Sequence, residues 1–318
     1  MRTTKLLLSL TAFIFAVCLV ALPAHAQATR TWVSGVGNDA DPCSRTAPCK
    51  TFAGAISKTA TGGEINCLDS GGFGAVTITK SIAIYCEGVI GGVLVSGTNG
   101  IIVNIPATSI VYLRGLDIEG ITTGLAGINF IQAGVLHVDN CIIRGFNAGT
   151  AAGIAFAPTG VGELQVSNSY ITDNGVGATG AGVLIRPSGA GSANVVLSEL
   201  HVENNALGIK IDNTVSTGGV NLSIADTVVG GNTNPGIAAF TTAGHGAPVV
   251  MINGTTSSYN SIGVRSDGPT AVIRMGSSTI TGNATGVIAA NGGTLQSYGN
   301  NQLTGNTVDG TPTSTPLH

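Results

Sequence analysis

Six side chains with useful chemistry recur in the second half of the chain, two or four residues after a repeated glycine: Arg186, Lys210, Asp212, Phe240, Arg265 and Asp267. Charges beside an aromatic ring can hold a sugar chain, because hydroxyl groups bond to carboxylates and the apolar face of a sugar packs on a ring. The pattern predicts a ligand-binding column for an extracellular polysaccharide or a cell-surface protein. The simpler interpretation is a solvated face with weak ion pairs.

A second acidic pair, Glu199 and Asp226, falls at one equivalent position of two successive segments. Two carboxylates that lie close together repel each other or share a cation. Calcium, which binds oxygen ligands, is the cation that this pair would take. Two turn residues facing water are the simpler interpretation, and no other cofactor is indicated.

Five cysteines lie beyond residue 26: Cys43, Cys49, Cys67, Cys86 and Cys141. In an oxidising compartment the first four pair most simply as sequence neighbours, Cys43 with Cys49 and Cys67 with Cys86. A zinc site is the alternative interpretation, but no histidine lies near these cysteines in the sequence and no C-x-x-C spacing occurs. Cys141 is left as a buried thiol or as a point of intermolecular pairing.

The N-terminus has the features of a secretory signal peptide. A basic start precedes an apolar run from Leu6 to Leu22 and an Ala24-His25-Ala26 site, which predicts cleavage before Gln27. The mature protein is then secreted or periplasmic, with no membrane span.

The composition excludes a nucleic-acid partner. The formal net charge is −3, and the loss of Arg2 and Lys5 with the leader makes it more negative. Nucleic-acid binding needs clustered basic side chains. The 48 glycines and 43% hydrophobic residues instead favour β-structure with many tight turns.

The elements that position these side chains repeat along the chain. Glycines that precede Ile or Val recur every 23 to 29 residues, at Gly127, Gly153, Gly182, Gly208, Gly236, Gly263 and Gly286. A period of this size indicates a solenoid.

Each unit continues with alternating residues, as in Ile209 and Ile211 after Gly208, which is the pattern of a strand with one buried face. Three short strands per unit predict an all-β, single-stranded right-handed parallel β-helix. Like residues of neighbouring coils, such as Ile154 and Val183, should then stack inside one tube.

Two sets of asparagines accompany the repeat. Asn140 and Asn168 should lie one above the other and bond amide to amide along the axis. A later set should form turns in the left-handed conformation, which asparagine tolerates: Asn174, Asn205, Asn232, Asn283 and Asn306.

The chain divides into four predicted parts: a signal peptide at 1–26, a cap at 27–64, the β-helix at 65–306 and a flexible tail at 307–318. Phe52 and Ile56 are four residues apart, so residues 50–60 predict a short amphipathic helix that covers the first coil. The tail is polar and rich in proline.

The Asn-x-x-Gly-Ile/Val phrases that begin at Asn205, Asn260 and Asn283 resemble the parallel β-helix repeats of the pectate-lyase-like superfamily. The opening from Thr31 to Phe52 resembles the capped entry of its secreted members. The resemblance covers most of residues 30–306 and implies the fold. That superfamily includes lyases, hydrolases, esterases and adhesin passengers, so the resemblance selects no activity.

Gly244-His245-Gly246 resembles the Gly-His-Gly phrase of polygalacturonases, which implies a catalytic role for His245 beside an aspartate trio. The carboxylate phrases of that family do not occur here, so a loop histidine is the simpler interpretation. Arg186-Pro187 matches only part of the Arg-x-Pro-x-x-Arg phrase of pectate lyases. We therefore expect a non-catalytic carbohydrate-binding, surface-binding or structural protein, with a polysaccharide lyase or glycoside hydrolase as the alternative.

Overall fold

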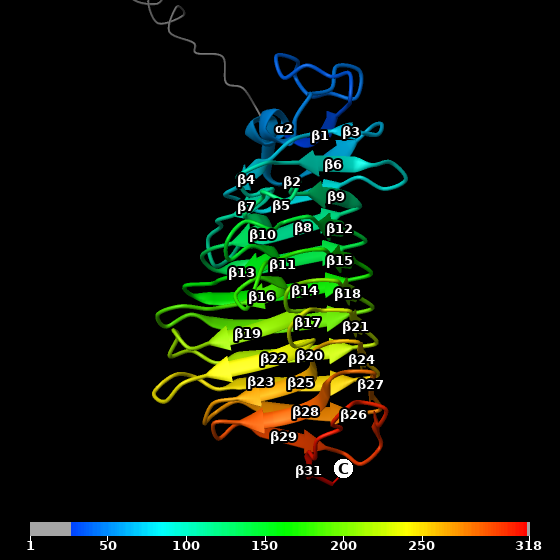
Figure 1. Ribbon diagram of the computed structural model, residues 1–318. Coiled ribbons are helices and arrows are strands. Elements are labelled where there is room, and N and C mark those ends of the chain that lie inside the picture. Colours follow the sequence, from blue (N-terminus) through cyan, green and yellow to red (C-terminus); the bar gives the residue numbers. More distant parts are fainter. Residues whose placement is uncertain (1–26, 317–318) are drawn as a thin grey trace, which may run out of the picture.

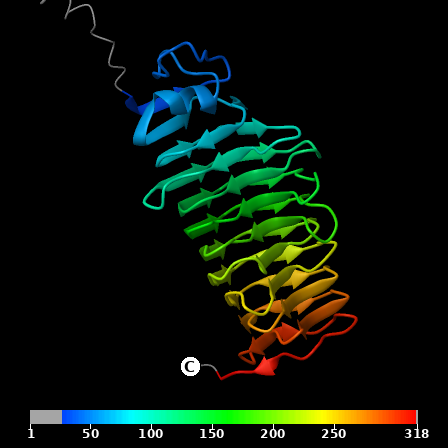
Figure 2. The same ribbon diagram turned by 90° about the vertical axis from the view of Figure 1, so that its left-hand side faces the viewer.

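Three parallel sheets wind around one axis in the computed structural model, which describes residues 27–316 (Figure 1). The predicted signal peptide lies outside the described residues. Seen from the side, the coils lie one on another as a stack (Figure 2). The right-handed parallel β-helix is confirmed, and its hand is the one that parallel crossover connections adopt.

Each coil adds one strand to each sheet. The twelve-stranded sheet contains β1 (Ala28–Val33), β2 (Thr59–Cys67), β5 (Ile82–Tyr85), β8 (Ile110–Arg114), β11 (Gly134–Asp139), β14 (Val161–Ser167), β17 (Ser192–Ser198), β20 (Val220–Ala225), β23 (Pro248–Asn253), β26 (Val272–Gly276), β29 (Thr294–Ser297) and β31 (Thr313–Ser314). The ten-stranded sheet contains β3 (Gly71–Gly72), β6 (Gly91–Leu94), β9 (Leu116–Glu119), β12 (Ile142–Arg144), β15 (Tyr170–Thr172), β18 (His201–Glu203), β21 (Val228–Gly230), β24 (Thr256–Ser258), β27 (Thr279–Thr281) and β30 (Gln302–Leu303). The nine-stranded sheet contains β4 (Val76–Ile78), β7 (Ile101–Val103), β10 (Ala126–Phe130), β13 (Ala152–Phe156), β16 (Ala181–Ile185), β19 (Ile209–Asn213), β22 (Ile237–Thr241), β25 (Ile262–Asp267) and β28 (Thr285–Ala290).

Apolar side chains stack coil upon coil along the interior. In the nine-stranded sheet Ile154, Val183, Ile209 and Ile237 follow one another in register, and all four are fully buried. Each such side chain contributes about 1.5 to 3 kcal/mol. The predicted continuous interior is therefore confirmed.

A left-handed residue turns the chain from the twelve-stranded into the ten-stranded sheet. Asn140 (φ 50°) and Asn168 (φ 48°) occupy this position in successive coils and are exposed. The Nδ2 of Asn168 donates to Asp139 Oδ1 at 2.9 Å rather than to Asn140. The predicted axial ladder of Asn140 and Asn168 is wrong, because the turn directs these amides toward solvent.

A buried amide ladder forms at the next corner instead, between the ten-stranded and nine-stranded sheets. Each of the first five members donates from Nδ2 to the Oδ1 of the next at 2.8 to 3.2 Å, and the six members are Asn174, Asn205, Asn232, Asn260, Asn283 and Asn306. The left-handed conformation belongs to the residue before each, such as Asp173 (φ 57°) and Asn204 (φ 55°). The predicted turn is therefore present, but the residue before each asparagine adopts the left-handed conformation. The asparagine itself forms hydrogen bonds to the neighbouring coil.

The N-terminal end is covered by α2 (Phe52–Lys58), as predicted. Thr51 caps the helix by accepting a hydrogen bond from the Gly54 N–H at 2.9 Å. Phe52 is fully buried, with its ring centroid 5.1 Å from that of Phe73 in the first coil. The helix thus shields the apolar end of the stack from water.

Both predicted disulfides are present, Cys43–Cys49 in the cap and Cys67–Cys86 between the first coils. Cys141 is a free and buried thiol, so of its two predicted fates the structure shows the first. No helix among residues 27–316 is both long and apolar enough to cross a membrane.

The chain continues to pair beyond residue 306, where the sequence predicts a tail. The N–H groups of Thr307 and Val308 donate to the carbonyls of Asn283 and Ala284 at 3.0 Å, and β31 pairs with β29. Part of the segment predicted as a tail is therefore hydrogen-bonded to the last coils.

Candidate ligand-binding site

The column predicted from the glycine spacing forms on the outer face of the nine-stranded sheet. Asp212 pairs in register with Phe240, and Phe240 pairs with Asp267. Arg186 lies one coil before Asp212, with its Nε 3.6 Å from Asp212 Oδ2. The repeat thus brings together side chains that are spread over 82 residues of sequence.

Two cations flank the ring of Phe240. Lys210 Nζ lies 5.7 Å and the Arg265 guanidinium carbon 5.6 Å from the ring centroid. Lys210 belongs to β19 and Arg265 to β25, on either side of β22, so they approach opposite sides of the ring. The expected packing of a sugar face on Phe240 therefore does not fit, because the protein's own cations occupy the ring faces.

Both carboxylates of the column are held by several partners. Asp212 accepts a hydrogen bond from Thr214 Oγ1 at 2.6 Å, and its Oδ2 lies 3.7 Å from Lys210 Nζ. Asp267 pairs with the guanidinium on its own strand and accepts from Asn291 Nδ2 at 2.7 Å. These contacts fix the two anions in place.

Loops beside the sheet turn this face into a pocket of about 370 Å³. Lys210, Asp212, Phe240 and Arg265 line it together with Ala178, Leu207, Thr214, Asn234 and Pro235, whereas Arg186 and Asp267 do not. The side chains of Lys210 and Asp212 are only 12% and 14% exposed. Charges this far out of water interact more strongly than those on an open surface.

The loops that line this pocket could not be predicted from the sequence. Asn234 Nδ2 donates to the Gly177 carbonyl at 3.1 Å and so joins two loops that are 57 residues apart. The Asn234-Pro235 pair is a turn signal that marks one of them. A turn signal of this kind does not indicate which face of the sheet the loop covers.

His245 stands apart from this pocket, in the turn between β22 and β23. It is half-buried, and its Nδ1 lies 2.9 Å from Thr242 Oγ1. It forms no ion pair with a carboxylate among the described residues.

Glu199 (φ 54°) and Asp226 (φ 48°) occupy the left-handed turn position of successive coils. Between residues 27 and 316, no three His, Cys, Asp or Glu side chains gather closely enough to hold a metal ion. A calcium ion between Glu199 and Asp226 would therefore need backbone carbonyls or water to complete its roughly six to eight oxygen ligands.

Comparison with known proteins gives a structural likeness but no sequence match. Neither a protein-family model nor a curated protein matches the sequence. The solved crystal structure of pectate lyase Pel9A superposes with a TM-score of 0.49 at 16% sequence identity, covering 84% of this chain and 79% of that chain.

Proposed function

We propose that this protein is an exported, non-catalytic β-helix that binds an acidic segment of an extracellular polysaccharide in the pocket around Phe240. The observation that carries the proposal is the convergence of Lys210 and Arg265 on one ring inside that pocket. The two disulfides support export, because such bonds persist in oxidising compartments.

The charges favour an acidic sugar over a neutral one. Three cations and two carboxylates make the column positive, although the whole chain carries −3. Arg186 is 47% exposed and lies at a long 3.6 Å from Asp212. From beside the pocket its guanidinium can therefore turn toward a uronate carboxylate, while sugar hydroxyls bond to Asp212 in the pocket lining.

The same geometry argues against hydrolysis. Inverting cleavage needs a water between two carboxyl groups. Here the ring of Phe240 stands between Asp212 and Asp267, and both carboxylates are in ion pairs.

Titration calorimetry with oligogalacturonate, compared with a neutral oligosaccharide of equal length, tests the binding. Arg186→Gln combined with Lys210→Ala should weaken binding of the acidic ligand about tenfold, and added salt should weaken it further. Arg45→Gln is the matched control, because Arg45 is an exposed cation in the cap. Equal affinity for the neutral ligand, or no loss in the double variant, would contradict the proposal.

Incubation with uronate polysaccharides, with and without calcium, addresses the alternative of a lyase or glycoside hydrolase. No unsaturated or reducing ends should appear. Product formation that Asp212→Asn or His245→Ala abolishes would establish an enzyme instead.

A further inference from the structure

The outer face of the twelve-stranded sheet carries a second set of side chains that the sequence reasoning did not single out. Register places Tyr112, His137 and Gln165 in one outward column. Arg114, Asp139 and Ser167 form a parallel column two residues further along the same strands. Six side chains from three coils thus face each other across a shallow trough.

One wall of the trough is a rigid aromatic stack. The rings of Tyr112 and His137 lie 4.6 Å apart at 8°, and Tyr112 is 40% exposed. On the other side of Tyr112 the register partner is Ala83, whose methyl group is too small to cover the ring. One face of Tyr112 is therefore open to a ligand, unlike the ring of Phe240.

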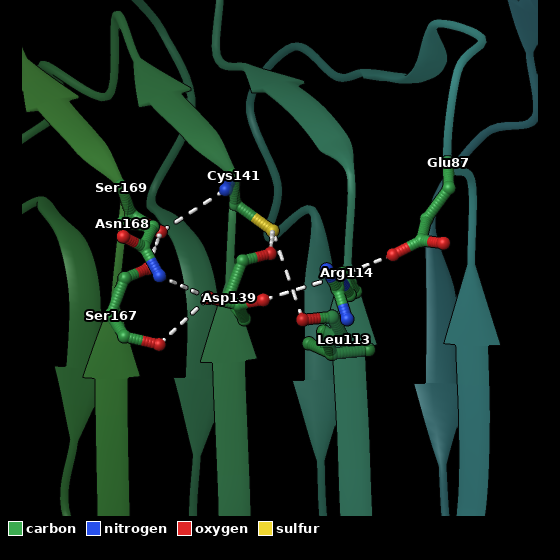
Figure 3. A network of polar contacts seen from close by, with 8 residues as sticks. All are labelled: Glu87, Leu113, Arg114, Asp139, Cys141, Ser167, Asn168 and Ser169. Carbon is green, nitrogen blue, oxygen red and sulfur yellow. Dashed lines mark hydrogen bonds and ion pairs between the residues drawn. The ribbon is translucent and has the colours of Figure 1, made fainter.

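On the opposite wall one cation lies between two carboxylates, which leaves this group with a net charge of −1. The Arg114 Nε lies 2.6 Å from Glu87 and 3.1 Å from Asp139 (Figure 3). Asp139 also accepts from Ser167 Oγ at 2.7 Å and from Asn168 Nδ2 at 2.9 Å. Burial raises the pKa of Asp139, but these hydrogen bonds and the nearby Arg114 outweigh it and hold that pKa below the ordinary value. Every charged group of this wall is in an ion pair, and the net charge of −1 disfavours an acidic ligand over a neutral one.

Two hollows follow one another along this face. The first, of about 210 Å³, lies between the two columns, with Leu113 and Val138 among its lining residues. The second, of about 370 Å³, begins at Glu163 on the same strand as Gln165. It continues over the outward side chains Asn194, Val196, Asn221, Ser223, Met251 and Arg274.

The hollows together cross eight strands, from β5 to β26, or about 34 Å at the spacing of neighbouring strands. The first hollow is smaller than the roughly 300 Å³ at the lower end of small-molecule pockets. It therefore suits one unit of a long ligand better than a whole small molecule.

We propose that the outer face of the twelve-stranded sheet, from Tyr85 to Arg274, binds one chain of a neutral, hydroxyl-rich polysaccharide that runs along the solenoid axis. Amides, hydroxyls and paired charges bond to sugar hydroxyls, and the C–H groups of a sugar pack on the open face of Tyr112. The site is independent of the pocket around Phe240, which lies on another sheet.

Affinity electrophoresis in gels containing soluble xylan, mannan or β-glucan tests this proposal. At least one of these polymers should retard the protein, and Tyr112→Ala should weaken its affinity about tenfold. Tyr170→Ala is the matched control, because Tyr170 forms the same kind of stack with His201, at 4.5 Å and 4°, on the ten-stranded sheet. The control should bind like the unaltered protein.

A second variant distinguishes loss of the open ring face from a folding defect caused by Tyr112→Ala. Ala83→Leu keeps every contact of the stack but covers the open ring face, so it should also reduce affinity. Polymers longer than about 34 Å should bind more tightly than short oligosaccharides, since they span both hollows. Lys210→Ala should leave this binding unchanged, which separates it from the proposed function.

Several results would overturn the proposal: no retardation by any neutral polymer, equal losses in Tyr112→Ala and Tyr170→Ala, or full affinity in Ala83→Leu. Binding of only charged polysaccharides would also overturn it, as would a protein that occupies this face in place of sugar.

Discussion

At the scale of single residues, buried amides connect one coil to the next. Asn232 is 2% exposed and accepts at Oδ1 from both the N–H and the Nδ2 of Asn205, at 2.9 and 3.2 Å. Its own Nδ2 donates to Asn260 Oδ1 at 2.8 Å and to the Val202 carbonyl at 3.2 Å. Each step of the ladder therefore satisfies polar groups that have no access to water.

Asn232→Ala should lower the free energy of unfolding by about 1 to 3 kcal/mol, because the buried donors of Asn205 lose their acceptor. Urea denaturation measures the change. Asn221→Ala is the control, since Asn221 is exposed on a strand and lies outside the ladder; it should cost far less. Equal losses in the two variants would show that the ladder adds nothing to stability.

At the scale of elements, the first coils differ from the rest because covalent bonds hold them. Cys67 ends β2 and Cys86 follows β5, so one disulfide ties together two neighbouring strands of the twelve-stranded sheet. The Cys43–Cys49 bridge closes the loop beside β1, and α2 covers the coil below. The helix α2 and the two disulfides together stabilise the N-terminal end of the stack against unfolding.

Removing the two disulfides should have unequal effects. The Cys67–Cys86 bridge separates its cysteines by 19 residues and the Cys43–Cys49 bridge by 6. In the chain-entropy account a longer loop gives more stabilisation, about 3 against about 2 kcal/mol here. Denaturation of the two double-serine variants should therefore show the larger loss for Cys67→Ser with Cys86→Ser. The reverse order would contradict the loop-length argument.

At the scale of the whole molecule, one apolar interior runs from the cap to the last coil. Each coil contacts chiefly its neighbours, so the stability of any coil depends on those above and below it. Cys141 lies in this interior, with its thiol 3.3 Å from the Asp139 carbonyl (Figure 3). Burial raises the pKa of this thiol to about 12, which keeps it protonated near neutral pH.

Cys141 should therefore report the opening of the solenoid. A thiol reagent should label it in the native protein only as fast as the surrounding coils unfold, and mild denaturant should speed the reaction steeply. Labelling followed by mass spectrometry measures the rate. Rapid labelling of the native protein would show that the middle coils open independently of global unfolding.

Five features could be predicted from the residues alone: the repeat, the inward face of each strand, the capping helix, the disulfide pairs and the register that aligns Arg186, Asp212, Phe240 and Asp267. These follow from local rules, since alternation fixes which side chains point inward and a repeated glycine marks the same place in every coil. Three others depended on how the coils pack together: which asparagines form the ladder, that cations cover the faces of Phe240, and that Tyr112 keeps one face open. Coils of 23 to 29 residues differ in their corners and loops, so the contacts made there depend on how neighbouring coils stack.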